Sequence, residues 1–259
     1  MGIGESIKKG FGVAQKSASL VSLLFVFGFI FNLVNVFLAP KGSLTAGAAA
    51  GTPPSPALIA AGVVFIFLSI FFQAGSMGFV RDLIKTGSAK LSSFSAAGGK
   101  YYLRLLVLGI VVSLVIGVFV LLAALSVAFV KDKLAPLGVL LAIFFGALGI
   151  YFVILLFLSP YVAVVDEKGV GESIKLSTKL VKKNILTLLG LSALLILIGF
   201  GIGLVLGAIL AGLTYLVKQE IASQVIFALL SSAVNAYLGV VVTAAFMNFY
   251  LSLSDRNNT

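Results

Sequence analysis

The stretch at residues 105–130, LLVLGIVVSLVIGVFVLLAALSVAFV, decides the fold class. It holds no Asp, Glu, Lys or Arg, and it is longer than the roughly 20 apolar residues that cross a bilayer core as a helix. Five other stretches share these properties: residues 18–39, 57–80, 134–165, 184–217 and 221–254. The sequence therefore predicts an all-α, polytopic integral membrane protein with six transmembrane helices.

The overall composition supports this prediction and excludes several kinds of protein. Of 259 residues, 61% are hydrophobic and 10% are charged, whereas soluble domains carry about 25% charged residues. A water-soluble enzyme of this length could not bury so much apolar surface. The chain has no Cys and no His, which removes thiolate nucleophiles, Cys-ligated zinc and the usual general base. We therefore expect no catalytic residues, no metal and no cofactor.

The distribution of positive charge predicts the orientation in the membrane. Of 18 Lys and Arg residues, all but four fall on the side that carries the N-terminus, the C-terminus and the segments after the second and fourth spans. The four on the other side are Lys41, Lys131, Lys133 and Lys218. Under the positive-inside rule, both termini are cytoplasmic in a plasma or inner membrane.

One span contains a proline that is expected to interrupt it. Pro160 follows Ser159 within the stretch at residues 134–165. Proline lacks a backbone N–H and clashes with the preceding turn of a helix. The sequence predicts a break in the fourth span at this point.

An internal repeat divides the chain. The heptapeptide at residues 2–8, GIGESIK, recurs at residues 169–175 as GVGESIK, and at the same offset Lys16 corresponds to Lys183. A weaker middle copy begins near residue 91. We expect a single membrane domain, 1–259, made of three tandem units at about 1–82, 83–166 and 167–259. Each unit would contain a cytoplasmic amphipathic helix followed by a transmembrane hairpin.

The amphipathic segments carry the candidate lipid-binding residues. Apolar residues recur at helical spacing in both copies of the repeat, and lysines occupy the remaining faces. Such a helix lies in the membrane interface with its lysines at the lipid phosphates. The candidate headgroup contacts are Lys8, Lys9, Lys16, Lys175, Lys179, Lys182 and Lys183. The expected partner is anionic lipid, and we do not expect the protein to bind nucleic acid.

A family resemblance lies in residues 160–189. There, Pro-Tyr-Val-Ala-Val-Val-Asp-Glu is followed by a glycine, by Glu-Ser-Ile-Lys-Leu-Ser and by a basic run into a Leu-rich span. The stretch resembles the six-helix membrane domain attached to some glycerophosphodiester phosphodiesterases and found in related uncharacterised inner-membrane proteins. The resemblance implies the six-helix topology. It implies no catalysis, because that family's activity belongs to a separate soluble domain.

Two stripes of small residues are candidate helix-packing sites. Residues four apart lie on one helix face, and small side chains there let two helices approach closely. The first stripe is Gly109, Ser113 and Gly117; the second is Gly199, Gly203 and Gly207, continued by Ala211. Packing within one bundle is the favoured interpretation, and dimerisation is the alternative.

The polar residues within the spans are Asn32, Asn35, Gln73, Asn235 and Asn248. We interpret them first as interhelical hydrogen-bonding groups. The alternative is a cavity for a neutral solute.

Three acidic residues cluster after the fourth span: Asp166, Glu167 and Glu172. They are expected to form a solvated ion-pair face with nearby lysines rather than a metal site or an acid–base pair.

The function predicted from these features is non-enzymatic. The charge-free spans and basic interfacial helices favour a membrane scaffold or accessory subunit that contacts lipids and a protein partner, in a larger membrane complex or a homo-oligomer. The alternative is a transporter or channel for neutral or lipid-like solutes, with a continuous polar path through the residues Asn32, Gln73, Asn235 and Asn248.

Overall fold

The structure is a computed structural model that describes residues 2–38, 55–129, 135–217 and 219–257. All of its regular secondary structure in these ranges is helical. The elements are α1 (Ile3–Lys16), α2 (Ala18–Leu38), α3 (Pro56–Thr86), α4 (Leu91–Phe129), α5 (Ala135–Leu156), α6 (Ser159–Val165), α7 (Val170–Leu216) and α8 (Glu220–Asn257). The predicted all-α class is therefore confirmed.

Six helical segments of the described chain are long and apolar enough to cross a membrane, as predicted. They are Ala18–Leu38, Pro56–Thr86, Leu91–Ala128, Pro136–Val165, Val170–Leu213 and Ile221–Ser254. The chain is thus built as a multi-pass membrane protein. Residues 39, 130 and 134 at the predicted span ends lie outside the described residues, as do the four lysines 41, 131, 133 and 218.

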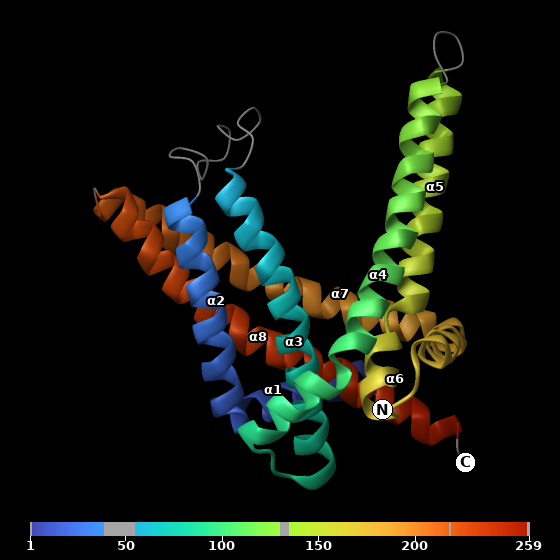
Figure 1. Cartoon of the computed structure of the whole chain (residues 1–259), viewed down its shortest axis with the longest axis horizontal. Helices are drawn as coiled ribbons and strands as arrows, with labels where there is room; N and C mark the ends of the chain where they lie inside the picture. The colour runs from blue at the N-terminus through green and yellow to red at the C-terminus, as the bar shows by residue number, and fades with distance from the viewer. Residues whose placement is uncertain (1, 39–54, 130–134, 218, 258–259) are drawn as a thin grey trace.

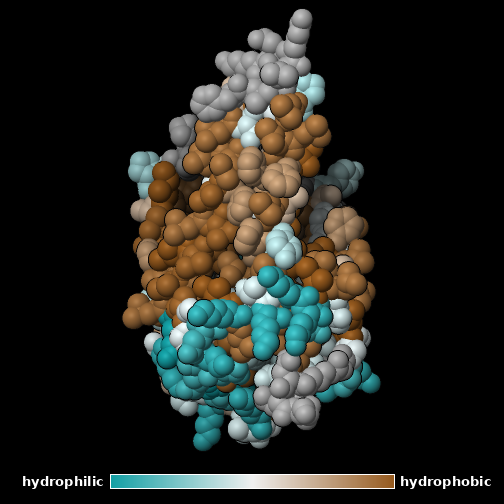
Figure 2. All heavy atoms as spheres, turned by 90° about the vertical axis from the view of Figure 1, so that its right-hand side faces the viewer, coloured by the Kyte–Doolittle hydropathy of each residue, from teal (hydrophilic) through white to brown (hydrophobic). Residues whose placement is uncertain are grey.

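The helices share one base and diverge from it (Figure 1). Helices α4 and α5 run side by side as a tall hairpin, while α2 and α3 rise separately and α7 and α8 cross behind them. Helix α1 lies across the base, and the end of α8 reaches the same end of the molecule. The surface agrees with this arrangement: Figure 2 shows a hydrophilic band at the base and hydrophobic side chains above it.

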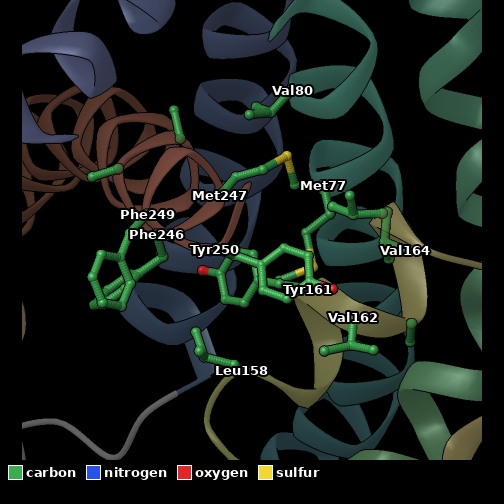
Figure 3. Packing of buried hydrophobic residues seen from close by; sticks show 14 of the residues in the cluster. Met77, Val80, Leu158, Tyr161, Val162, Val164, Phe246, Met247, Phe249 and Tyr250 are labelled. Carbon is green, nitrogen blue, oxygen red and sulfur yellow. The ribbon is translucent and has the colours of Figure 1, made fainter. Parts of the chain in front are cut away.

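The core lies at the base, where α3, α6 and α8 meet. Figure 3 shows side chains from these helices, and from the turn just before α6, packed together. The buried members labelled there are Met77, Val80, Leu158, Tyr161, Val162, Val164, Phe246, Met247, Phe249 and Tyr250. Farther from the base the helices expose large apolar side chains such as Ile196 and Leu140. Those outer surfaces match a lipid environment, in which apolar exposure is favourable.

The break expected at Pro160 is present. Helix α5 ends at Leu156 and α6 begins at Ser159. A tight turn joins them, in which the Phe157 amide donates to the Ile154 carbonyl at 3.2 Å. The hydroxyl of Ser177 on α7 donates to the Leu155 carbonyl at 2.7 Å, so a neighbouring helix binds a carbonyl beside the break.

The two copies of the repeat begin in the same way. Gly2 precedes α1 and Gly169 precedes α7, each with an extended backbone. Their carbonyls accept from the amides of Ser6 and Ser173 at 3.1 Å and 2.9 Å, and both serines are fully buried.

The two copies also turn at the same place. Ser17 separates α1 from α2, and its repeat equivalent Asn184 is the non-helical residue inside α7. The Ser17 hydroxyl donates to the Val13 carbonyl at 2.6 Å, and the Asn184 amide donates to the Leu180 carbonyl at 3.0 Å. Side-chain bonds of this kind compete with helical ones and bend helices. The turns are therefore equivalent in position and in chemistry.

The middle unit differs from the expectation. A separate amphipathic helix was expected near residues 91–104, but α4 runs unbroken from Leu91 to Phe129. In the middle copy, Tyr101 follows Lys100 and takes the place that Ser17 has after Lys16. Its side chain is too long to bond back to a carbonyl of its own helix. It is fully buried instead, and the helix continues.

Helices α2 and α3, which form the first predicted hairpin, contact each other through aromatic side chains. Stacked rings join them, with centroids 4.4 Å apart for Phe27 and Phe65 and 3.8 Å apart for Phe27 and Phe72. Helix α2 also contacts α8, because the Asn32 amide donates to the Ser232 hydroxyl at 2.8 Å.

Candidate functional site

Glu167 is the centre of a charged cluster that joins three parts of the chain. Its Oε1 lies 2.7 Å from Lys100 Nζ on α4 and 3.3 Å from Arg81 Nη1 on α3. It also accepts from the Tyr101 hydroxyl at 2.7 Å. Glu167 itself lies between α6 and α7, so one carboxylate connects this turn to two membrane-spanning helices.

Tyr101 is the buried core of this cluster. Its hydroxyl donates to Glu167 and accepts from Arg81 Nη1 at 2.6 Å. Three cations surround its ring: the side chains of Arg81, Lys100 and Arg104 lie 5.6, 5.2 and 5.8 Å from the centroid. A desolvated ring contributes cation–π stabilisation at these distances. The ring therefore helps to hold three positive charges close together.

Arg81 and Arg104 also bind backbone carbonyls around the turn. Arg81 Nη1 donates to the Val164 carbonyl at 3.0 Å, and Arg104 Nη1 donates to the Glu167 carbonyl at 2.7 Å. A further ion pair joins Arg81 Nη2 to Asp82 at 2.8 Å. The two arginines thus hold the end of α6 and the turn that follows it.

The backbone of Glu167 is unusual. Its φ of 56° lies in the left-handed region, which costs a residue with a Cβ about 1–2 kcal/mol. The contacts from Lys100 and Arg104 keep it there. This conformation makes the sharp turn from α6 into α7.

The neighbours of Glu167 lower the pKa of its carboxyl group. The hydrogen bond from Lys100, followed by that from Tyr101, lowers the pKa of this carboxyl to about 2. The group therefore stays ionised at every physiological pH. A permanently charged carboxylate that binds groups on two helices holds these helices together and is poorly suited to transfer protons.

The acidic residues were predicted with the wrong partners. Nearby lysines were expected to pair with them, but Glu167 pairs with Lys100 and Arg81, which are remote in sequence. Asp166 accepts from the Tyr250 hydroxyl on α8 at 2.6 Å. Residues this distant meet only through the tertiary fold. Within the described chain, no three His, Cys, Asp or Glu residues are placed to hold a metal ion.

All seven candidate lipid-binding lysines have exposed side chains. They belong to α1 and to the first part of α7: Lys8, Lys9, Lys16, Lys175, Lys179, Lys182 and Lys183. Lys9 forms an ion pair with Glu5 at 3.0 Å on the surface of α1.

The opposite faces of these two segments are docked on the bundle. On α1 the buried residues are Ser6, Gly10 and Ala14. A Cβ on Gly10 would lie 2.7 Å from the Val241 carbonyl of α8. On the first part of α7, the buried residues are Ser173, Ser177, Leu180 and Val181. With these faces docked, the lysines face outward.

In the described part of the chain, the two small-residue stripes make no close contact with another helix. No atom of another described helix comes within 4 Å of the position that a Cβ would take on Gly109, Gly117, Gly199, Gly203 or Gly207. Ser113 and Ala211 have exposed side chains. The four-residue spacing shows that these small residues share one helix face, but it does not show whether a second helix packs against that face.

Other glycines make the close approaches. A Cβ on Gly78 would overlap Ala97, and a Cβ on Gly75 would lie 2.6 Å from the Phe94 ring. Both contacts join α3 to α4. On the α4–α5 hairpin, a Cβ on Gly149 would lie 2.8 Å from that of Phe119.

The polar residues of the spans make contacts of different kinds. Asn32 bonds across to Ser232, while Asn35 and Asn248 donate to carbonyls of their own helices at 3.0 and 2.9 Å. Of the five, Gln73 lines a cavity between α3, α4 and α6. The interhelical hydrogen bond favoured from the sequence is thus present at Asn32.

Comparison with known proteins places the chain in a family. A model described as "Domain of unknown function (DUF7847)" matches residues 1–253. The chain belongs to the DUF7847 family. No curated protein and no solved structure matches it. The DUF7847 assignment covers both copies of the repeat and all six apolar helices, so the whole membrane unit is the family's domain.

Proposed function

We propose that the chain is a non-enzymatic membrane scaffold or accessory subunit that is anchored on anionic lipid by α1 and the first part of α7. The observation that carries the proposal is the division of these segments into two faces. Buried residues dock one face on the bundle, and the seven lysines lie exposed outside it. Hydrophilic side chains gather at the base of the molecule (Figure 2).

The proposal extends to orientation and partners. The lysine-rich base faces the cytoplasmic leaflet of a plasma or inner membrane, where anionic lipids attract basic segments. Both termini are then cytoplasmic. The open stripe of Gly199, Gly203 and Gly207 on α7 leaves room for a helix of a protein partner or of a second copy.

The experiment measures lipid preference directly. The protein is placed in nanodiscs of equal phosphatidylglycerol and phosphatidylcholine, and the lipids retained after release are counted by native mass spectrometry. Near an anionic surface each lysine contributes about 1 kcal/mol, or roughly fivefold in affinity. Substitution of Lys8, Lys9 and Lys16 by Gln should therefore sharply lower the phosphatidylglycerol retained, and high salt should do the same.

The control variant replaces two exposed lysines that lie outside α1 and α7. Lys85 and Lys90 are exposed at the α3–α4 turn, and their substitution by Gln should leave most of the preference intact. Equal phosphatidylglycerol retention by the wild type and the α1 variant would overturn the proposal.

A further inference from the structure

A cavity of about 310 Å³ lies where α3, α4, α6 and α7 meet. Polar groups on its wall come from three helices: Gln73 on α3, Ser113 on α4 and Ser159 on α6. Gly109 also lines it, and no other atom lies within 4 Å of where its Cβ would be. This volume is within the range of small-molecule sites, about 300–1,000 Å³.

Ser159 gives the cavity an unsatisfied hydrogen-bonding group. The residue is 1% exposed, and its Oγ has no hydrogen-bond partner among the described residues. A buried hydroxyl without a partner costs about 1–3 kcal/mol, and such groups are rare in folded proteins. A ligand that hydrogen-bonds this hydroxyl would recover that free energy.

An apolar groove continues from this cavity along the α4–α5 hairpin. A second cavity, of about 240 Å³, shares Gln73 and Pro160 with the first and is also lined by Val153. Val153 in turn lines a groove of about 510 Å³ between α4 and α5.

The groove follows a single face of α4. Its wall there includes Ile116, Phe119 and Ala123, and the second cavity is lined by Val112. These residues are spaced three or four apart, so they share one helical face. From Val112 to Ala123 this face extends about 16 Å at 1.5 Å per residue.

The residues that line the three cavities indicate whether the polar group of a ligand would be charged or uncharged. No described residue that lines any of the three cavities is charged. Gln73 precedes Arg81 by eight residues on the continuous helix α3, which places it about 12 Å deeper than the charged cluster. A phosphate or carboxylate at that depth would be desolvated without a counter-charge. An uncharged head group fits.

We propose that this track binds an uncharged, single-chain amphiphile of the monoacylglycerol type. Its hydroxyl or ester group bonds to Ser159 and Gln73, and its alkyl chain follows the groove between α4 and α5. The site is separate from the lysines of α1 and α7, so it is independent of the proposed lipid anchoring.

The test titrates the delipidated full chain with 1-monooleoylglycerol and follows binding by native mass spectrometry and by thermal unfolding. The expected result is one bound molecule and a rising Tm. Oleate and lysophosphatidylcholine carry similar chains with charged heads and should bind at least about tenfold more weakly. Equal binding of the three amphiphiles would overturn the proposal, because it would show only non-specific contact with alkyl chains.

Matched variants separate the site from the general lipid surface. Ser159→Ala should weaken binding about five- to tenfold by removing the hydroxyl, and Gly109→Leu should abolish it by filling the cavity. The controls are Ser126→Ala, where the serine hydroxyl already donates to the Leu122 carbonyl, and Gly203→Leu, at a glycine that also has room for a side chain but lies outside the three cavities. Both should bind as the wild type does.

Two outcomes overturn the site. The first is unchanged binding by Ser159→Ala, and the second is an equal loss in Gly109→Leu and Gly203→Leu. If Gly109→Leu does not fold, Ser113→Leu replaces it, because Ser113 lines the same cavity and is exposed. The variant with Lys8, Lys9 and Lys16 changed to Gln should bind monooleoylglycerol normally, so this site and the lipid anchor can fail separately.

Discussion

At the scale of single residues, the structure depends on a few polar groups placed beside the membrane-spanning helices. Glu167 accepts from Lys100 and Tyr101 and forms an ion pair with Arg81. Its sequence neighbours gave no sign of these partners, because Arg81 is 86 residues away. Helical periodicity places a charge on a face of its own helix, but it cannot say which other helix will face it.

The pH dependence of stability should report on Glu167. Its pKa is lower in the folded protein than the ordinary value of 4.5 and lies at about 2. A lowered folded-state pKa stabilises the protein above the unfolded value, and this contribution is lost as the pH falls from about 4.5 towards about 2. In detergent, the Tm of the wild type should therefore fall more steeply over this range than that of Glu167→Gln. Parallel curves would contradict this assignment.

Removal of the Tyr101 hydroxyl should loosen the same cluster. Tyr101→Phe keeps the ring but removes a group that bonds to both Arg81 and Glu167. Hydrogen bonds to charged groups contribute about 1.5–3 kcal/mol, so the variant should unfold at a clearly lower temperature. The matched control is Tyr102→Phe on the neighbouring, half-buried residue. A Tm for Tyr101→Phe equal to that of this control would show that the hydroxyl contributes nothing.

At the scale of helices, side-chain chemistry at the turn decides whether a segment separates from the span that follows. Ser17 and Asn184 each bond back to their own helix, and the chain bends there. Tyr101 has no such bond within the described chain, and α4 continues. These two bends lie at equivalent positions of the sequence repeat. The segment near residues 91–104 is continuous with the span that follows it, because that copy lacks the residue that makes the turn.

The docking of α1 should be sensitive to the size of one residue. In Gly10→Leu the new side chain would meet the Val241 carbonyl of α8, so α1 must move away. Overpacking of this kind costs about 1–3 kcal/mol, and amide hydrogen exchange in α1 should rise. Gly12→Leu places the same side chain on the same helix in open space and should exchange like the wild type. Equal exchange in the two variants would disprove the contact.

At the scale of the whole molecule, three similar contacts connect the predicted tandem units. Helix α1 packs on α8 through Gly10, and the start of α4 packs on α3 through Ala97 and Gly78. The start of α7 bonds to the end of α5 through Ser177. In each case the opening segment of one unit contacts the closing helix of the unit before it, and the first unit contacts the last. This is the arrangement that three tandem units would adopt in a closed ring, and the units themselves remain a prediction.

Composition and periodicity predicted the helical class, the six apolar helices and the break at Pro160, because each depends on local sequence. The contact partners of Glu167 and of the close-approach glycines depend on tertiary packing. The cavity with Ser159 has the same origin, since no single stretch of sequence brings together Gln73, Ser113 and Ser159.

The central claim is that the lysines of α1 and of the first part of α7 lie at the lipid headgroups. The chain has no Cys, so Lys9→Cys and Lys179→Cys each give one site for a nitroxide label, and Ile196→Cys on the apolar surface of α7 gives a deep reference. Accessibility to oxygen and to a water-soluble nickel complex in phosphatidylglycerol-containing vesicles then measures depth. We predict that the first two labels lie at the level of the phosphates and the third within the hydrocarbon. Bulk-water accessibility at both Lys9→Cys and Lys179→Cys would contradict the account.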